Sequence, residues 1–206
     1  MLLVEQGLRR AQSPEGTDSG KSPLRPMIDP QHPFAARAPH LPARAKRVVV
    51  IFCSGACSHL DTFDYKPELT KLHGQPLPGE EKPDVFFGQV GRLRQPDWEF
   101  RQRGESGLWI SELFPHLAEV ADELALIRSM DAETSNHTPA TFQGNSGFRL
   151  NGFPVAGAWV SYGLGSATDD LPAYLVIPEQ RGVPAGGSIN WTSGFLSAQQ
   201  QGVIIR

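Results

Sequence analysis

The sequence predicts a parallel α/β domain, and three apolar runs carry this prediction. Residues 47–55 (RVVVIFCSG) hold six consecutive apolar residues before Ser-Gly, as expected for a strand buried on both faces of a parallel sheet. A second run at 124–130 (LALIRSM) and a third at 172–179 (PAYLVIPE) each follow a segment with helical spacing. This order of strands and helices predicts right-handed crossover units.

Four helices are expected between and after these strands. They are predicted, in chain order, at 67–72, at 111–124 with Ser111 as its cap, at about 139–146 with Thr138 as its cap, and at 154–165. The second tolerates Pro115 because that residue lies in the first turn. Gly147 should end the third helix. Residues 75–108 show no sustained period and are expected to form a long irregular excursion.

Residues 1–44 are rich in Pro, Ser, Gly and Arg, so we expect a mostly disordered leader or tail before the domain at 45–206. Arg9-Arg10 is typical of a twin-arginine export signal, but polar residues follow it. A working signal needs roughly 7–15 apolar residues at that place. The localisation therefore stays open.

The composition and charge bear on whether nucleic acid or a membrane is a partner. The chain is 39% hydrophobic and 20% charged, with a net charge of −3, which gives no indication of nucleic acid as a partner. No apolar run approaches the roughly 20 residues of a membrane span. The cysteines, Cys53 and Cys57, have neither the spacing of a zinc pair nor that of a redox pair, and are interpreted as small, half-buried residues.

Two loops collect the polar side chains that suit chemistry. One follows the first predicted strand, the other follows the second strand at a helix start, and both should open at the carboxyl edge of the sheet, where ligands bind. The candidate metal ligands are His59, Asp61, Asp64 and His137, and the candidate anion-binding residues are Asn136 and Thr138. Imidazole and carboxylate groups suit zinc or a similar divalent metal, and the first turn of a helix favours phosphate or sulfate.

The candidate metal-binding and anion-binding residues also have purely structural explanations. Asp61 and Asp64 can cap a segment or close a turn, His59 can bond a backbone carbonyl, and Asn136 and Thr138 can be helix caps. The residue types alone leave these alternatives open.

Several blocks, in order, resemble the domain-of-unknown-function family 1501, a sulfatase-like family of the alkaline phosphatase-like superfamily. They include RVVVIFCSGACSHLDTFDYKPEL, GLWISELFPHLAEVADELALIRSM, NHTPATFQGNSG and NWTSGFLSAQQQGV. The resemblance implies an alkaline phosphatase-like α/β core, metal-dependent hydrolysis of phosphate or sulfate esters, a divalent metal such as zinc or calcium, and export to the periplasm.

Thr138 is the candidate catalytic residue, although the resemblance puts it one residue away from the position of the sulfatase nucleophile. His137-Thr138-Pro139 is similar in spacing to the sulfatase pattern Cys-x-Pro, with His137 in the nucleophile's place. Where the superfamily has an acidic ligand directly after the first strand, this chain has Cys53-Ser54-Gly55, and no His follows His137. We therefore expect only the N-terminal part of the domain here, inactive alone. The alternatives are a non-catalytic protein that binds an anionic ligand such as a glycan, and a scaffold.

Overall fold

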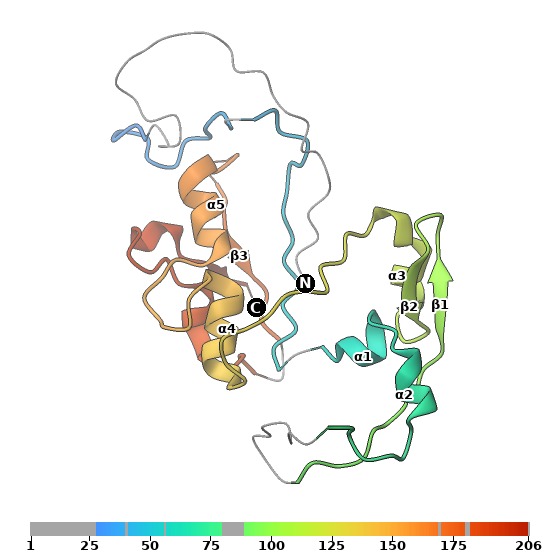
Figure 1. The fold of residues 1–206 in the computed structure, drawn as a ribbon. Helices are drawn as coiled ribbons and strands as arrows, with labels where there is room; N and C mark the ends of the chain where they lie inside the picture. Colours follow the sequence, from blue (N-terminus) through green and yellow to red (C-terminus); the bar gives the residue numbers. More distant parts are fainter. Residues whose placement is uncertain are drawn as a thin grey trace, which may run out of the picture. The chain divides into compact units, whose positions relative to one another are not determined.

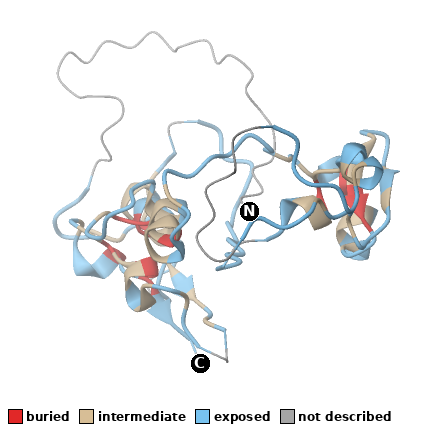
Figure 2. Cartoon of the chain, turned by 60° about the horizontal axis from the view of Figure 1, so that its bottom comes forward, coloured by how far each residue is buried: buried red, intermediate tan, exposed pale blue. Residues whose placement is uncertain are grey.

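The computed structural model of the chain describes residues 28–39, 41–55, 57–79, 89–168, 170–179 and 182–205. These residues form two compact units, the first made of 50–131 and the second of 28–49 and 132–205 (Figure 1). The Arg9-Arg10 pair lies outside the described residues. Buried side chains gather inside each unit (Figure 2), so each unit has a small core of its own.

The first unit is built from short elements around a β-hairpin. In chain order they are α1 (His59–Thr62), α2 (Pro67–Lys71), β1 (Phe100–Arg103), β2 (Leu108–Ser111), α3 (Pro115–Glu119) and the 3₁₀ turn η1 (Ala121–Glu123). Strands β1 and β2 pair antiparallel, with Phe100 opposite Ser111 and Arg103 opposite Leu108.

The hairpin turn depends on glycine and on one carboxylate. Gly104 and Gly107 have φ angles of 62° and 65°, values that side chains with a Cβ rarely adopt. Asp122 in η1 accepts hydrogen bonds from the amides of Glu105 at 3.0 Å and Ser106 at 2.8 Å. These bonds lower the pKa of the Asp122 carboxyl, because they stabilise its charged form.

The core of the first unit lies under one face of this hairpin. Ile110 is fully buried and packs with Phe63 and Ala121, so β2 joins the loop after α1 to the turn after α3. The partly buried residues around this core are Leu108, Phe114, Leu117, Ala118, Leu124 and Leu126.

The second unit places two helices beside a short parallel pair of strands. Its elements are α4 (His137–Ser146), α5 (Ala156–Leu164), β3 (Leu175–Val176), the 3₁₀ turns η2 (Gly187–Trp191) and η3 (Ala198–Gln200), and β4 (Val203–Ile204). Leu175 pairs with Val203 and Val176 with Ile204 in parallel register.

Tyr174, just before β3, packs closely against helix α5. A Cβ added at Gly157 of α5 would lie 2.5 Å from the Tyr174 ring, and one at Gly202 would lie 3.0 Å from it. Two glycines therefore provide the space for this ring. Burial raises the pKa of the Tyr174 hydroxyl.

Three of the predicted helices are confirmed. The segment predicted at 67–72 is α2, and the one predicted at 154–165 is the slightly shorter α5. The helix predicted from 139 is α4, which begins two residues earlier, is capped by Asn136 instead of the predicted Thr138, and ends at Gly147 with a φ of 85°. A left-handed glycine is a common helix end because it has no Cβ to clash.

The predicted helix at 111–124 is wrong at its start. Ser111 is the last residue of β2 and is fully buried, and its hydroxyl accepts from the Leu113 amide at 3.3 Å instead of capping a helix. The helix begins only at Pro115, whose missing N–H is tolerated at the first helical position. After Val120 the chain continues as the 3₁₀ turn η1.

The strands predicted at 47–55 and 124–130 also differ from the structure, where neither segment has regular secondary structure. Val49 is 81% exposed and Met130 is 78% exposed. A strand needs neighbours for its backbone N–H and C=O groups, and within the described residues the paired strands are β1 with β2 and β3 with β4. The parallel alkaline phosphatase-like core stays a prediction.

Part of the predicted leader is ordered against α5. The amide of Arg37 donates to the carbonyl of Leu164 at 2.9 Å, and Ser166 donates to the carbonyl of Phe34 at 2.8 Å. A Cβ at Gly165 would clash with the backbone of Ala35. Residues 34–37 are therefore bonded to the end of α5 by backbone contacts, which composition alone does not indicate.

Candidate functional sites

The loop around α1 is organised by hydrogen bonds within the first unit. Ser58 Oγ donates to Asp61 Oδ2 at 2.6 Å, and the Asp61 amide donates to the Ser58 carbonyl at 3.2 Å. The Asp61 carbonyl accepts from the buried Ser111 Oγ at 2.6 Å. Asp61 thus closes the start of α1, one of the structural roles that the sequence left open, while one carboxylate oxygen is bound by a neutral hydroxyl.

Asp64 is an ion-pair residue. Its side chain is only 14% exposed, and its carboxylate lies 2.9 Å from Lys66 Nζ and 3.7 Å from Arg128 Nη1. Two cations thus offset its charge in this structure, and the role of Asp64 as a metal ligand stays a prediction. His59 is exposed, and its backbone carbonyl accepts from the amides of Phe63 and Asp64.

The second candidate loop forms the first turn of α4. Asn136 Oδ1 accepts from the Thr138 amide at 3.2 Å, so Asn136 is the helix cap. The Ala140 amide donates to the Asn136 carbonyl at 3.0 Å. His137 is exposed and Thr138 half-buried. Pro139 has no N–H, which leaves the His137 amide as the one first-turn donor with no acceptor among the described residues.

The metal ligands predicted from the sequence lie in both units. His59 and Asp61 belong to the first unit and His137 to the second. Among the described residues, no three His, Cys, Asp or Glu side chains are grouped to hold a metal ion. The prediction that His59, Asp61 and His137 converge stays a prediction.

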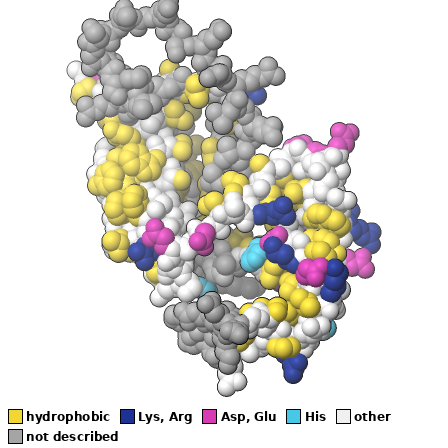
Figure 3. Space-filling model, viewed as in Figure 1, with side chains coloured by type: hydrophobic (Ala, Val, Ile, Leu, Met, Phe, Trp, Pro, Cys, Tyr) yellow, Lys and Arg dark blue, Asp and Glu magenta, His cyan; other side chains and the backbone are white. Residues whose placement is uncertain are grey.

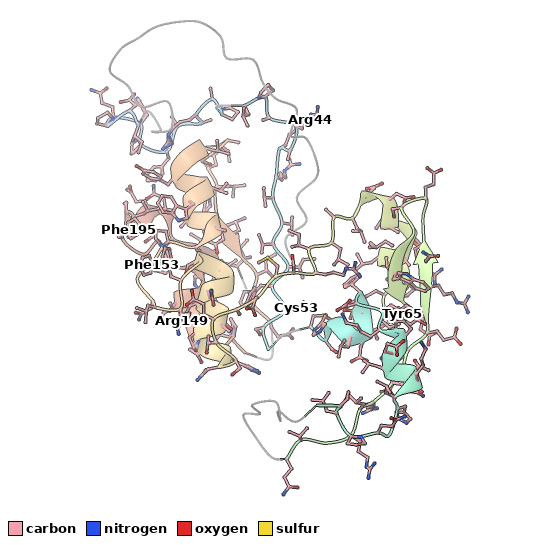
Figure 4. All side chains as sticks on the ribbon, in the orientation of Figure 1. Arg44, Cys53, Tyr65, Arg149, Phe153 and Phe195 are labelled. Carbon is pink, nitrogen blue, oxygen red and sulfur yellow. The ribbon has the colours of Figure 1, made fainter. Side chains whose placement is uncertain are left out.

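Sequence reasoning missed an aromatic groove in the first unit. Its lining residues are Tyr65, Thr70, Pro96, Trp98, Glu99 and Phe100, and its volume is about 250 Å³. Tyr65, labelled in Figure 4, packs against Phe100 with ring centroids 5.3 Å apart and against Trp109 at 4.5 Å. The only signal in the sequence is a set of three aromatic residues around the turn with Gly104 and Gly107. Trp98 and Phe100 precede this turn, and Trp109 follows it.

A second aromatic cluster lies on the surface of the other unit. Phe153 stacks on Phe148 with ring centroids 3.9 Å apart and contacts Phe195 edge-on at 6.4 Å (Figure 4). Trp159 of α5 lies 5.8 Å from Phe195. Hydrophobic side chains gather on this unit in Figure 3. Exposed apolar patches of this kind are typical of interaction surfaces.

The loop around α1 and the capped helix α4 hold the candidate residues predicted from the sequence, one segment in each unit. Comparison with known families assigns the chain: it belongs to the family described as "Protein of unknown function (DUF1501)", which matches residues 45–206. No curated protein and no solved structure matches the chain.

Helix length also bears on the relation to membranes. In the ranges that the structure describes, every helix is too short or too polar to cross a bilayer.

Proposed function

We propose that this chain contributes the ester-binding turn of a metal-dependent hydrolase that acts on phosphate or sulfate esters. The observation that carries the proposal is the position of His137 and Thr138 in the first turn of α4, a helix of ten residues. The helix dipole favours an anion at this end by about 0.3–1 kcal/mol. Membership of the DUF1501 family, with its resemblance to sulfatases, supports the chemistry.

Each residue of the turn has a stated role in this proposal. The free amide of His137 and the hydroxyl of Thr138 would bind the ester oxygens, and Thr138 is the candidate catalytic hydroxyl. Asn136 holds the turn by capping the Thr138 amide at 3.2 Å. The His137 imidazole of this turn is the proposed ligand of a zinc or calcium ion.

The test is a residue-resolved NMR titration of the chain with inorganic sulfate and inorganic phosphate, against chloride at equal ionic strength. We expect saturable shifts at the amides of His137 and Thr138, because these lie at the positive end of α4. Shifts that are absent, or that spread over surface Lys and Arg residues instead, would overturn the proposal.

A second readout concerns hydrolysis and metal. Zinc and calcium content and turnover of an aryl phosphate and an aryl sulfate are measured for the chain, for His137→Ala and for His116→Ala. His116 is the matched control, since its side chain is 91% exposed on α3. We expect bound metal to fall only in His137→Ala. No turnover is expected from the chain alone, so the metal content is the deciding readout. Metal that is retained in His137→Ala, or lost equally in His116→Ala, would contradict the role assigned to His137.

A further inference from the structure

The groove of the first unit has an aromatic wall and a polar rim. Tyr65, Trp98 and Phe100 supply the wall, and Thr70 and Glu99 supply a hydroxyl and a carboxylate. Its volume of about 250 Å³ lies just under the roughly 300–1,000 Å³ of pockets for drug-sized ligands. The groove therefore has the size for one small ring.

The wall is held in place by the hairpin. Alternation along paired strands puts Phe100 and Trp109 on the face opposite to the buried Ile110. Tyr65 packs on both rings, with centroid distances of 5.3 Å and 4.5 Å. Because the ring positions are set by the core beneath them, binding would cost little ordering of side chains.

Trp98 differs from these rings because it is 42% exposed. It lies in the segment that leads into β1, at the edge of the groove. An aromatic face carries a negative quadrupole, so an exposed indole attracts the slightly positive C–H groups of an aliphatic or sugar ring. Trp98 thus provides the stacking surface.

The charges beside the groove are already paired. Glu99 Oε2 binds Arg101 Nη2 at 3.0 Å, and Arg94 is paired with Asp97. Paired charges give little net attraction for an ionic ligand, but the second oxygen of Glu99 can still accept a hydrogen bond. Sugar hydroxyls both donate and accept, and they match Thr70 and Glu99.

We infer that this groove binds a neutral sugar ring of a glycan, with the C–H face of the ring on Trp98 and its hydroxyls on Thr70 and Glu99. This site lies wholly in the first unit and uses none of the residues of the α4 turn. Its failure and the failure of the proposed hydrolase function are therefore distinguishable.

The experiment is saturation-transfer NMR and a tryptophan-fluorescence titration of the whole chain. The probes are methyl β-glucopyranoside, methyl β-galactopyranoside, methyl α-mannopyranoside and the linear tetrasaccharide cellotetraose. We expect saturable binding of at least one, with transfer strongest to the C–H protons of one ring face. Trp98→Ala should weaken it by roughly tenfold, the equivalent of about 1.4 kcal/mol, and Trp98→Tyr should restore most of the loss.

The matched control is Trp159→Ala, since Trp159 is 44% exposed and lies in the other unit. It should leave sugar affinity unchanged, and circular dichroism should be the same for all variants. The inference is overturned by equal loss in both tryptophan variants or by no saturable binding of any probe. Preference for glucose 6-sulfate, tetramethylammonium or a proline-rich peptide over the neutral sugars would also overturn it.

Discussion

Helix α5 contains two glycines for which opposite effects of the same substitution are expected. Gly157 lies under Tyr174, and a Cβ there would come within 2.5 Å of two ring atoms. Gly163 has no atom within 4 Å of the same added carbon. Glycine inside a helix costs roughly 0.5–1 kcal/mol relative to alanine. At Gly163, alanine should therefore raise the free energy of unfolding by up to about 1 kcal/mol.

At Gly157 the same gain is opposed by crowding. Overpacking a filled site costs about 1–3 kcal/mol, so Gly157→Ala should lower the free energy of unfolding by about 1 kcal/mol net. The two alanine variants should therefore differ by about 2 kcal/mol.

Urea denaturation followed by far-UV circular dichroism measures these differences. A double-mutant cycle tests the cause: in a Tyr174→Leu background, where the ring is absent, Gly157→Ala should become neutral or stabilising. The reasoning is refuted if Gly157→Ala is as stabilising as Gly163→Ala in the natural background. It is also refuted if its cost is unchanged after the ring is removed.

Two further predictions concern the first unit. Ser111→Ala removes the buried donor to the Asp61 carbonyl and should destabilise the unit by about 1–3 kcal/mol. Ser58→Ala, at an exposed position, should cost less than about 1 kcal/mol. Hydrogen exchange at the α1 amides measures both losses, and equal losses would contradict burial as the cause of the difference. For Asp122, the lowered pKa means that its contribution is present above the ordinary Asp pKa and is lost as pH falls through the lowered value. In Asp122→Asn, the midpoint of unfolding should depend less on pH across that acidic window. An unchanged pH profile would show that the titration of Asp122 is not coupled to folding.

The two proposals assign different ligands to different units. The α4 turn is proposed for an anionic ester, and the aromatic groove of the first unit for a neutral sugar. An esterase that acts on a substituted glycan needs both kinds of recognition, one for the ester and one for the ring that carries it. Each is tested with its own probe and its own control variant.

The sequence by itself determined the elements whose signals are local. Pro67 and Gly147 mark a helix start and a helix end because their backbone preferences do not depend on distant residues. The family assignment likewise came from the sequence, through ordered blocks that the family match at 45–206 confirms. The segment with His137 and Thr138 was correctly predicted to lie at a helix start, although the helix begins at His137 and its cap is Asn136.

Tertiary structure decided everything that depends on a partner far along the chain. Ser111 has the residue type of a helix cap, but its hydroxyl is used by the Asp61 carbonyl 50 residues away. Asp64 lies close to a cation that is far along the chain, Arg128, as well as to the nearby Lys66. The apolar run at 47–55 has strand character, but strand formation needs an adjacent strand, which sequence pattern cannot supply.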